Sequence, residues 1–327
     1  MKSKNKVFPQ SSRSQGFSSF NLSEFIAKAG AFIRLTRPFF LLGGVLLNLL
    51  GTSIAISAGG AFDLASLLLG QLLVTSIQLM VHYSNEYYDR EVDQASAGNR
   101  TWFSGGSGVL PDGGLTPLVA LHAAQVCAGI SFVTLVLVSI RTPVMSVIGV
   151  LVLFAAWFYS APPLRLVSTG WGEFTASIIV AFFVPLTGWV LQSGLSSLPL
   201  SFLVLCLTLV LIHMGMLITF ELPDVESDAA FGKRTLTVRL GLERVAWLHN
   251  GLIAGAFIIY GGMALLGTLG TSGRFIFLAV PLAVWQEIRI VWHLRHREAS
   301  FDWLTLGAVS LFGLSVLLWM AGIFLPA

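Results

Sequence analysis

Long apolar runs separated by short polar segments dominate the chain. Nine runs approach the length of about 20 residues that a helix needs to cross a bilayer. Strands of a membrane barrel would instead alternate apolar and polar positions over about ten residues, and these runs do not alternate. The pattern therefore predicts an all-α, polytopic membrane protein with nine transmembrane helices. The runs cover residues 39–58, 64–84, 116–139, 143–160, 171–192, 198–219, 246–268, 275–291 and 304–325.

The distribution of Lys and Arg predicts the orientation of these helices. When the N-terminus and the loops after the second, fourth, sixth and eighth runs share one side, that side carries every Lys and Arg except Arg141 and Arg274. Cytoplasmic loops carry an excess of Lys and Arg, so we expect a cytoplasmic N-terminus. The two longest loops, after the second and sixth runs, lie on the same side, and we expect the functional residues there.

The N-terminal segment differs from the rest of the chain. We expect a flexible basic tail over residues 1–22 and a single nine-helix domain over residues 23–327. Residues 1–20 are basic, Ser-rich and free of acids, and no apolar core follows at the spacing of a cleaved secretory signal. A cytoplasmic tail is the favoured interpretation, and an organellar transit peptide is the alternative. Residues 23–36 place their apolar side chains on one face, which predicts a helix lying in the membrane interface.

Composition supports the membrane assignment. Hydrophobic residues make up 55% of the 327 residues and charged residues 11%, whereas soluble domains carry about 25% charged residues. Cys127 and Cys206 both lie inside apolar runs, so neither a disulfide framework nor a Cys-ligated zinc site is expected. The net charge of +3 is too small to indicate nucleic acid. The expected macromolecular partner is the lipid bilayer, with no nucleic acid and no obligate protein partner.

Acidic residues gather where the second and sixth runs end. Asn85, Asp89 and Asp93 are spaced four residues apart, so they share one helix face, and Asp224 and Asp228 have the same spacing. Like charges at this spacing repel, and two such faces brought together need cations. Oxygen ligands select Mg²⁺ or Ca²⁺, and Mg²⁺ takes one or two carboxylates plus phosphate oxygens. The pattern predicts a site where metal ions hold a diphosphate; solvated loop acids are the alternative.

Basic residues lie next to both acidic clusters. Arg37 precedes the first run and Lys233 follows the second acidic cluster, and phosphate oxygens need such cationic partners. Arg100 lies in the first long loop, Arg165 in the loop after the fourth run, and Arg234 beside Lys233. These residues are candidate diphosphate ligands. The general excess of positive charge on cytoplasmic loops is the alternative explanation for them.

Polar residues also continue deeper into two of the runs. Gln78 and His82 extend the face of Asn85 toward the middle of the second run, and His213 lies eleven residues before Asp224 in the sixth. Polar groups inside a span usually face the interior of the bundle. Gln78, His82 and His213 are therefore candidates for the wall of an acceptor pocket. Hydrogen bonding between helices is the alternative, and it is slightly favoured over the pocket role.

The two aspartate motifs together resemble those of the UbiA superfamily of intramembrane prenyltransferases. The segment from Asp228 to Gly241 is most similar to the 1,4-dihydroxy-2-naphthoate branch, which makes menaquinone or phylloquinone precursors. Residues 220–223 lack the Asn and Arg that this branch usually carries there, and loop 99–108 lacks the Lys-Pro-x-Arg-Pro pattern of the ubiquinone, haem O and chlorophyll branches. The resemblance covers about residues 30–325 and includes Arg37 with Pro38, and Tyr159 to Arg165 followed by Gly172 and Glu173.

The resemblance implies nine helices around a central cavity and transfer of an isoprenyl group from a polyprenyl diphosphate to an aromatic acceptor. The implied acceptor is 1,4-dihydroxy-2-naphthoate and the implied cofactor is Mg²⁺. Metal and basic side chains neutralise the leaving pyrophosphate, and the aromatic ring attacks the allylic cation in a site that excludes water. The implied roles are metal ligation by Asp89, Asp93, Asp224 and Asp228, orientation of a metal or phosphate oxygen by Asn85, diphosphate binding by Arg37, Lys233, Arg165, Arg234 and Arg100, and stabilisation of the cation by Tyr159.

Several alternatives remain open from the sequence. Tyr159 is equally compatible with a tyrosine at the membrane interface. The same superfamily includes enzymes with other quinone or lipid acceptors and terpene cyclases. A secondary transporter would place acids near the bilayer midplane, whereas the two acidic clusters here lie at span ends. A non-catalytic scaffold does not need the five spaced motif residues. We expect a multi-pass protein of a prokaryotic cell membrane.

Overall fold

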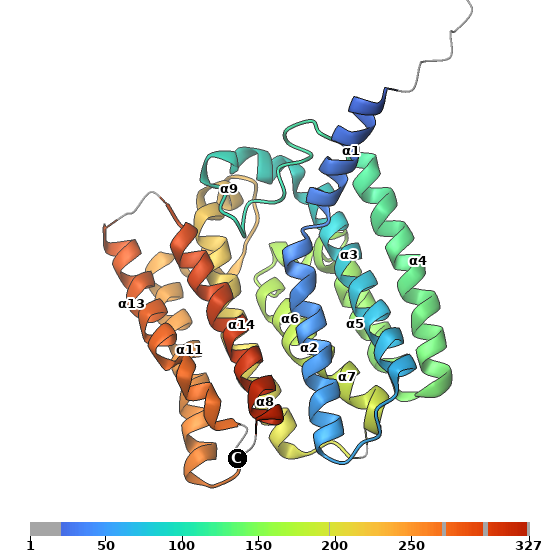
Figure 1. The fold of residues 1–327 in the computed structure, drawn as a ribbon. Helices are drawn as coiled ribbons and strands as arrows, with labels where there is room; N and C mark the ends of the chain where they lie inside the picture. The colour runs from blue at the N-terminus through green and yellow to red at the C-terminus, as the bar shows by residue number, and fades with distance from the viewer. Residues whose placement is uncertain (1–20, 196, 270–272, 297–299, 326–327) are drawn as a thin grey trace, which may run out of the picture.

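The fold is a bundle of long, roughly parallel helices (Figure 1). The computed structural model describes residues 21–195, 197–269, 273–296 and 300–325, so most of the predicted basic tail lies outside the described residues. The helices are α1 (Leu22–Leu35), α2 (Pro38–Ser57), α3 (Leu64–Ala95), η1 (Ala97–Asn99), α4 (Pro117–Arg141), α5 (Val144–Ser160), η2 (Leu166–Ser168), α6 (Gly172–Ile178), η3 (Ile179–Phe183), α7 (Val184–Ser193), α8 (Leu200–Glu221), η4 (Leu222–Asp224), α9 (Val225–Ala230), α10 (Leu236–Leu240), α11 (Leu242–Leu265), η5 (Arg274–Ala279), α13 (Val280–His296) and α14 (Asp302–Phe324).

The prediction of an all-α membrane protein is confirmed. The described residues contain helices and no strand. Within the described residues, eight helical segments are long and apolar enough to cross a membrane, and α5, with 17 residues, is a shorter apolar helix. The count of nine spans and the cytoplasmic N-terminus stay predictions.

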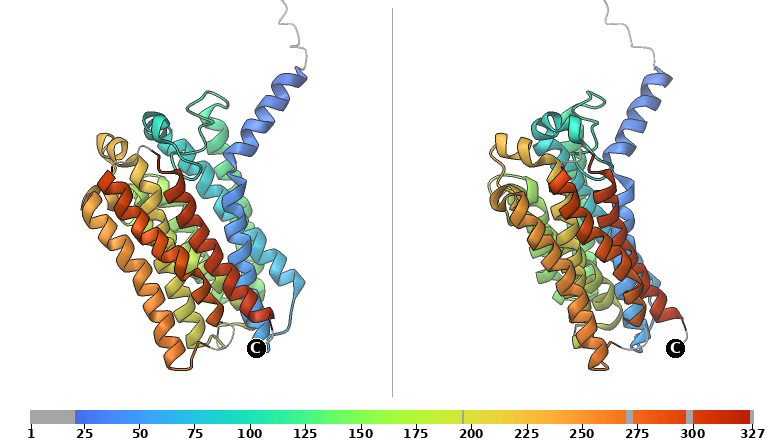
Figure 2. Two further views of the ribbon diagram at one scale, coloured as in Figure 1. Left: turned by 60° about the vertical axis from the view of Figure 1, so that its left-hand side comes forward. Right: turned by 90° about the vertical axis from the view of Figure 1, so that its left-hand side faces the viewer.

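Helix α1 projects from one end of the bundle (Figure 2). The Asn21 side chain accepts hydrogen bonds from the backbone N–H groups of Ser23 and Glu24 and so caps its first turn. Ala31 and Leu35 are buried against the bundle. The apolar side chains on the other side of α1 are exposed; they are Leu22, Phe25, Ile26 and Ile33. The location of this helix in the membrane interface stays a prediction.

Two spans differ from their predicted form. Helix α3 continues to Ala95, well beyond its apolar run, and carries the first acidic cluster on its last turns. The sixth run ends in three pieces, because α8 is followed by the 3-10 turn η4 and then by α9. Pro223 lies in η4 and cannot donate the backbone hydrogen bond that would continue α8. Asp224 is therefore the N-cap residue of the short separate helix α9, and Asp228 lies inside α9.

Close backbone contacts join α2 to the span formed by α6, η3 and α7. A Cβ added at Gly51 would overlap the backbone of Pro185, and one added at Gly188 would overlap the backbone of Asn48. Small residues allow helices in membranes to approach in this way. The π-helical turn η3 lies in the same span, and such turns are frequent at functional sites.

Candidate active site

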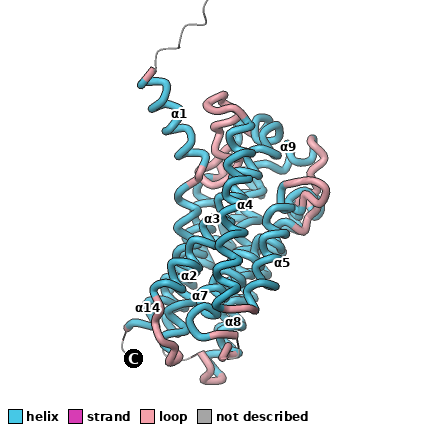
Figure 3. Tube along the Cα trace, turned by 90° about the vertical axis from the view of Figure 1, so that its right-hand side faces the viewer, coloured by secondary structure: helices cyan, strands magenta, loops and turns pink. Residues whose placement is uncertain are grey.

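Both acidic clusters lie at the end of the bundle from which α1 projects, and we call this the acidic end. The loops around α9 and the loop between α3 and α4 gather there (Figure 3). Asp89 is buried and is the centre of a network of contacts: its Oδ2 accepts hydrogen bonds from Asn85 Nδ2 at 2.9 Å and from Lys233 Nζ at 3.1 Å. Asn85 Nδ2 also donates to Ser160 Oγ at 3.2 Å. The network joins helices α3 and α5 to the loop after α9.

Lys233 connects the two acidic clusters. Its Nζ lies 3.1 Å from Asp89 Oδ2 and 3.3 Å from Asp228 Oδ1. All three side chains are buried. Burial by itself would lower the pKa of Lys233, but the charges of Asp89 and Asp228 outweigh it and raise the pKa above its usual value. Lys233 therefore stays protonated and holds the ends of α3 and α9 together.

Polar contacts between loops complete the approach of the two clusters. The hydroxyl groups of Ser96 and Ser227 share a short hydrogen bond, and Ser227 Oγ donates to the carbonyl oxygen of Asp224 at 2.9 Å. Asn99 Nδ2 donates to the carbonyl oxygen of Pro223 at 3.3 Å. The end of α3 and the η4–α9 segment therefore form one surface, as the predicted metal–diphosphate site requires.

Glu86 anchors the loop between α3 and α4. Its two carboxylate oxygens accept hydrogen bonds from the backbone N–H of Ser107 at 2.6 Å and from Ser107 Oγ at 2.8 Å. The neighbouring Gly106 has a positive φ of 70°, and an added Cβ would overlap Asp93 Oδ2. Only glycine adopts this conformation without strain and leaves room for the carboxylate. The loop is thus shaped around Asp93.

The donor set at the acidic end fits Mg²⁺. Asp93 Oδ2 and Asp224 Oδ1 are buried and have no hydrogen-bond partner, although buried polar atoms usually have one. Among the residues that the structure describes, no three Asp, Glu, His or Cys side chains stand close enough to enclose a metal by themselves. A metal here would need ligand or water oxygens as well, as Mg²⁺ usually does.

The predicted diphosphate ligands do not all lie at the site. Arg37 Nη2 donates to the carbonyl oxygen of Phe103 at 3.2 Å, and its charge acts on Asp93. Arg165 Nη2 lies 3.7 Å from Asp89 Oδ1. Arg100 is held by Gly105, whose carbonyl oxygen accepts from Nε at 2.9 Å, and its charge acts on Asp224. The side chain of Arg234, in contrast, is exposed beside Lys233.

Arg37 and Arg165 share an unusual backbone conformation. In the described part of the chain they are the two non-glycine residues with a positive φ, of 50° and 42°. Such a conformation costs about 1–3 kcal/mol and is retained where the surroundings or a function require it. Both arginines lie next to the acidic clusters, so the strain coincides with the candidate diphosphate ligands.

An apolar cavity of about 650 Å³ extends from the acidic end into the bundle. Arg37, Asn85 and Tyr159 line it near the acidic end. Leu42 on α2 and Leu317 on α14 also line it and are about half exposed, so the cavity reaches the lipid-facing side of the bundle between these helices. Such a space accommodates an apolar chain.

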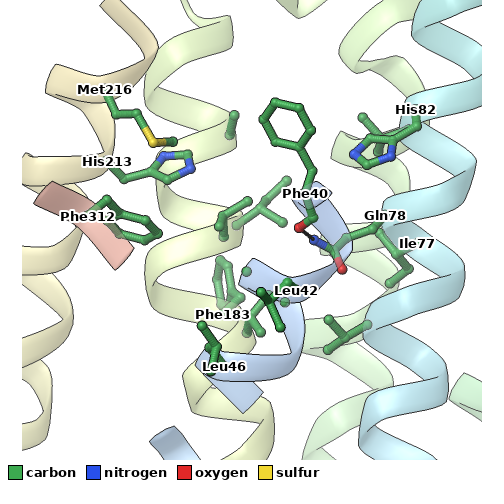
Figure 4. Close-up of a pocket in the computed structure, with 18 of the residues that line it drawn as sticks. Phe40, Leu42, Leu46, Ile77, Gln78, His82, Phe183, His213, Met216 and Phe312 are labelled. Carbon is green, nitrogen blue, oxygen red and sulfur yellow. Dashed lines mark hydrogen bonds between the residues drawn. The ribbon is translucent and has the colours of Figure 1, made fainter. Parts of the chain in front are cut away.

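The deeper polar residues line the same cavity (Figure 4). Gln78 Nε2 donates to the carbonyl oxygen of Phe40 at 3.4 Å, and Gln78 Oε1 is buried without a partner. His82 Nδ1 lies 3.0 Å from the carbonyl oxygen of Thr36. His213 faces the cavity from the opposite side and lies 3.0 Å from Ser177 Oγ. Gln78, His82 and His213 thus all line the same cavity. Each of them also contacts another residue of the bundle.

Three aromatic rings pack against one another in the wall of the cavity. The rings of Phe40, Phe103 and Phe220 come from α2, the α3–α4 loop and α8, and their centroids lie 6.0–6.2 Å apart. The guanidinium of Arg37 stacks 4.8 Å from the centroid of Phe40. Sequence spacing did not reveal this cluster, because its members lie on three separate segments.

Four further polar residues at this end were not predicted as site residues. Glu86 and Glu221 lie off the four-residue spacing, and Ser107 and Ser160 carry no charge. The position of the two acids at the end of an apolar run is the sequence feature that could have indicated a role at the site. For the two serines no such signal exists, since their role depends on contacts with distant residues.

Comparisons with known proteins agree with this geometry. The model of the UbiA prenyltransferase family matches residues 45–317. The chain belongs to the UbiA prenyltransferase family. It is therefore a multi-pass membrane enzyme of the prenyltransferase class, and the predicted resemblance is confirmed.

Individual relatives differ in the activities that their names state. The chain is 26% identical over 264 residues to a 1,4-dihydroxy-2-naphthoate octaprenyltransferase of Bacillus subtilis, covering 77% of this chain and 79% of the relative. It is 27% identical over 174 residues to the chloroplastic chlorophyll synthase of Arabidopsis thaliana, covering 52% of this chain and 42% of that protein. A UbiA homologue of Archaeoglobus fulgidus, solved bound to GPP and Mg²⁺, shares the fold with a TM-score of 0.63 and 16% identity over 90% of this chain and 100% of that one.

Proposed function

We propose that this UbiA-family enzyme transfers an isoprenyl group from a polyprenyl diphosphate to 1,4-dihydroxy-2-naphthoate, with Mg²⁺ bound at the acidic end. The observation that carries the proposal is the convergence of the two acidic clusters on Lys233, which lies 144 residues from Asp89 along the chain, at the end of an apolar cavity. The acids and basic residues suit a metal-bound diphosphate, and the cavity suits its isoprenyl chain.

The side chains at the acidic end have distinct proposed roles. Asp89, Asp93, Asp224 and Asp228 hold the metal, which when bound neutralises the charge of the diphosphate as it leaves. Asn85 orients a metal or phosphate oxygen through its contact with Asp89. Arg37, Lys233 and Arg165 bind the diphosphate, with a weaker contribution from Arg100, and the exposed Arg234 is given no role.

The cavity supplies the surroundings for the second step. The three aromatic rings of Phe40, Phe103 and Phe220 and the apolar wall exclude water, which would otherwise capture the allylic cation. The ring face of Tyr159, on the same wall, stabilises the positive charge. Gln78, His82 and His213 orient the acceptor, whose electron-rich ring carbon attacks the terminal carbon of the isoprenyl chain and then loses a proton.

The naphthoate acceptor is favoured by the similarity of residues 228–241 to that branch and by the Bacillus subtilis relative, whose match covers most of both chains. This relative is bacterial, and it supports a location in a prokaryotic cell membrane. The chlorophyll synthase relative supports a second candidate, a larger macrocyclic acceptor. A screen of purified enzyme with one prenyl diphosphate and a panel of aromatic acceptors, read by product mass, separates them. Cyclised prenyl product without any acceptor would instead indicate a terpene cyclase.

A double-mutant experiment tests whether the two acidic clusters form one site. Asp89→Asn and Asp224→Asn should each lower kcat on the order of 10²-fold or more, as losses of charge stabilisation in a transition state do. Residues that act as a unit are not additive, so the double variant should be little worse than the worse single one. Glu226→Gln, whose side chain is exposed on α9, is the control and should retain wild-type turnover. Multiplying losses, or a damaging control, would contradict the single site.

A further inference from the structure

Two glutamates, the buried Glu173 and the half-buried Glu221, hold the loop that carries Lys233. Glu173, on the first turn of α6, accepts a hydrogen bond at Oε1 from the backbone N–H of Leu236 at 2.6 Å. Glu221, at the end of α8, accepts at Oε2 from Thr237 Oγ1 at 2.7 Å and from the backbone N–H of Thr237 at 3.4 Å. The two carboxyl groups are neighbours that act on each other. Both therefore bind the start of the short helix α10.

The bound segment leads directly back to Lys233. The backbone N–H of Lys233 donates to the carbonyl oxygen of Asp228 at 2.8 Å, and the N–H of Arg234 donates to the carbonyl oxygen of Ser168 at 3.0 Å. From Lys233 to Thr237, the segment is thus fixed at both ends and in its middle. A chain held in this way has little freedom to move the Lys233 ammonium away from Asp89 and Asp228.

Glu173 also links this loop to the loop that carries Arg165. Residues 165–171 precede α6, and Ser168 in that loop accepts the Arg234 N–H. The two basic residues that contact Asp89, Lys233 and Arg165, therefore come from loops that are bonded to each other. The carboxyl groups of Glu173 and Glu221 lie where these two loops meet.

We infer that Glu173 and Glu221 form a clamp, the Glu173–Glu221 clamp, that positions Lys233 and Arg165 on the acidic site. They are positioning residues, because neither is among the residues that line the cavity. The inference rests on the proposed function, in which Lys233 and Arg165 bind the diphosphate. Buried carboxylates in a membrane protein are costly and tend to persist where they have a function, and holding the basic loops gives these two a function.

A double-mutant cycle with Lys233 tests the clamp. Glu173→Ala should lower kcat on the order of 10²-fold, as displacement of a catalytic group by about 1 Å does. In a Lys233→Met background the same change should cost markedly less than about 10²-fold, limited to the effect of displacing Arg165, because residues that act through one another are not additive. Glu173→Gln keeps an oxygen that accepts the Leu236 N–H and should recover most of the activity. Losses that multiply in the double variant would overturn the clamp.

A second variant, Thr237→Val, does not depend on the stability of Glu173→Ala, and a second readout does not depend on activity. Thr237→Val preserves the volume of a buried side chain and removes only the hydroxyl donor to Glu221, so it should lower kcat by roughly 3–10-fold, the equivalent of one hydrogen bond. Trypsin cleavage after the exposed Arg234 should be slow in the wild type and on the order of 10-fold faster in Glu173→Ala, since local opening exposes the backbone. Glu226→Ala is the control for both measurements.

The outcomes separate the clamp from the proposed function. If the wild-type protein transfers a prenyl group to no acceptor, the proposed function is refuted. The cleavage comparison does not measure activity, so it would still test the clamp. Active wild type together with unchanged cleavage in Glu173→Ala and Thr237→Val would refute the clamp alone.

Discussion

Gly106 offers a sharp test of the role of Asp93, because a second glycine in the same loop serves as its control. Gly106 and Gly113 have nearly the same backbone conformation, with φ values of 70° and 72°. A Cβ added at Gly106 would overlap Asp93 Oδ2, whereas one added at Gly113 meets no atom within 4 Å. The two alanine variants therefore share the backbone strain and differ in the contact with the carboxylate.

The expected magnitudes follow from this difference. A left-handed conformation costs an alanine about 1–2 kcal/mol, so both variants should show a similarly lowered midpoint of thermal unfolding in detergent. Only Gly106→Ala forces Asp93 or the loop to move, and a shift of about 1 Å at a catalytic group costs on the order of 10²-fold in rate. We expect that loss in Gly106→Ala, with a weaker apparent affinity for Mg²⁺, and nearly wild-type turnover in Gly113→Ala.

The assay is the initial rate of prenyl transfer over a range of Mg²⁺ concentrations, at saturating prenyl diphosphate. Equal losses of turnover in the two variants would assign the effect to strain in the loop. Wild-type turnover in Gly106→Ala would show that Asp93 needs no fixed position. Either result would refute the argument that the glycine is required by the carboxylate.

Three further predictions address other parts of the molecule. Lys233→Met should lower the midpoint of thermal unfolding, because removal of one partner from a buried ion pair costs about 3–5 kcal/mol. The control Arg244→Met, at an exposed position, should leave the midpoint unchanged. Gln78→Leu should raise KM for the acceptor by roughly 3–10-fold, the equivalent of one hydrogen bond, and leave KM for the prenyl diphosphate unchanged; parallel changes in both would contradict a role in the acceptor pocket. In intact cells a membrane-impermeant maleimide should label Thr268→Cys and spare Ala97→Cys, and the reverse would overturn the predicted orientation.

The sequence predicted those features that depend on local patterns. Apolar runs are local, so the bounds of most spans were predicted to within a few residues. The four-residue spacing of Asn85, Asp89 and Asp93 is also local, and α3 carries all three as one continuous helix. At the second cluster the same reasoning was incomplete. The predicted helical face is broken at η4, and Pro223 was the residue in the sequence that indicated the break.

Contacts between distant segments could not be predicted. Nothing in the spacing of Lys233 indicates that it reaches Asp89, and the contact of Glu86 with Ser107 depends on the path of a glycine-rich loop. Sequence reasoning grouped Arg234 with Lys233 as neighbours in the chain, yet one side chain is exposed and the other buried. The difference arises because the backbone of Arg234 is bonded to Ser168, which fixes the turn.

Glu86 differs from Asp93 and Asp224 in what its carboxylate oxygens contact. Both oxygens of Glu86 are hydrogen-bonded to Ser107, so this carboxylate is fully used in holding a loop. Asp93 and Asp224 each keep a buried oxygen without a protein partner. A buried carboxylate oxygen without a partner is costly unless a ligand completes it. This difference supports the proposed roles, in which Glu86 holds a loop in place and the free oxygens of Asp93 and Asp224 bind the cation.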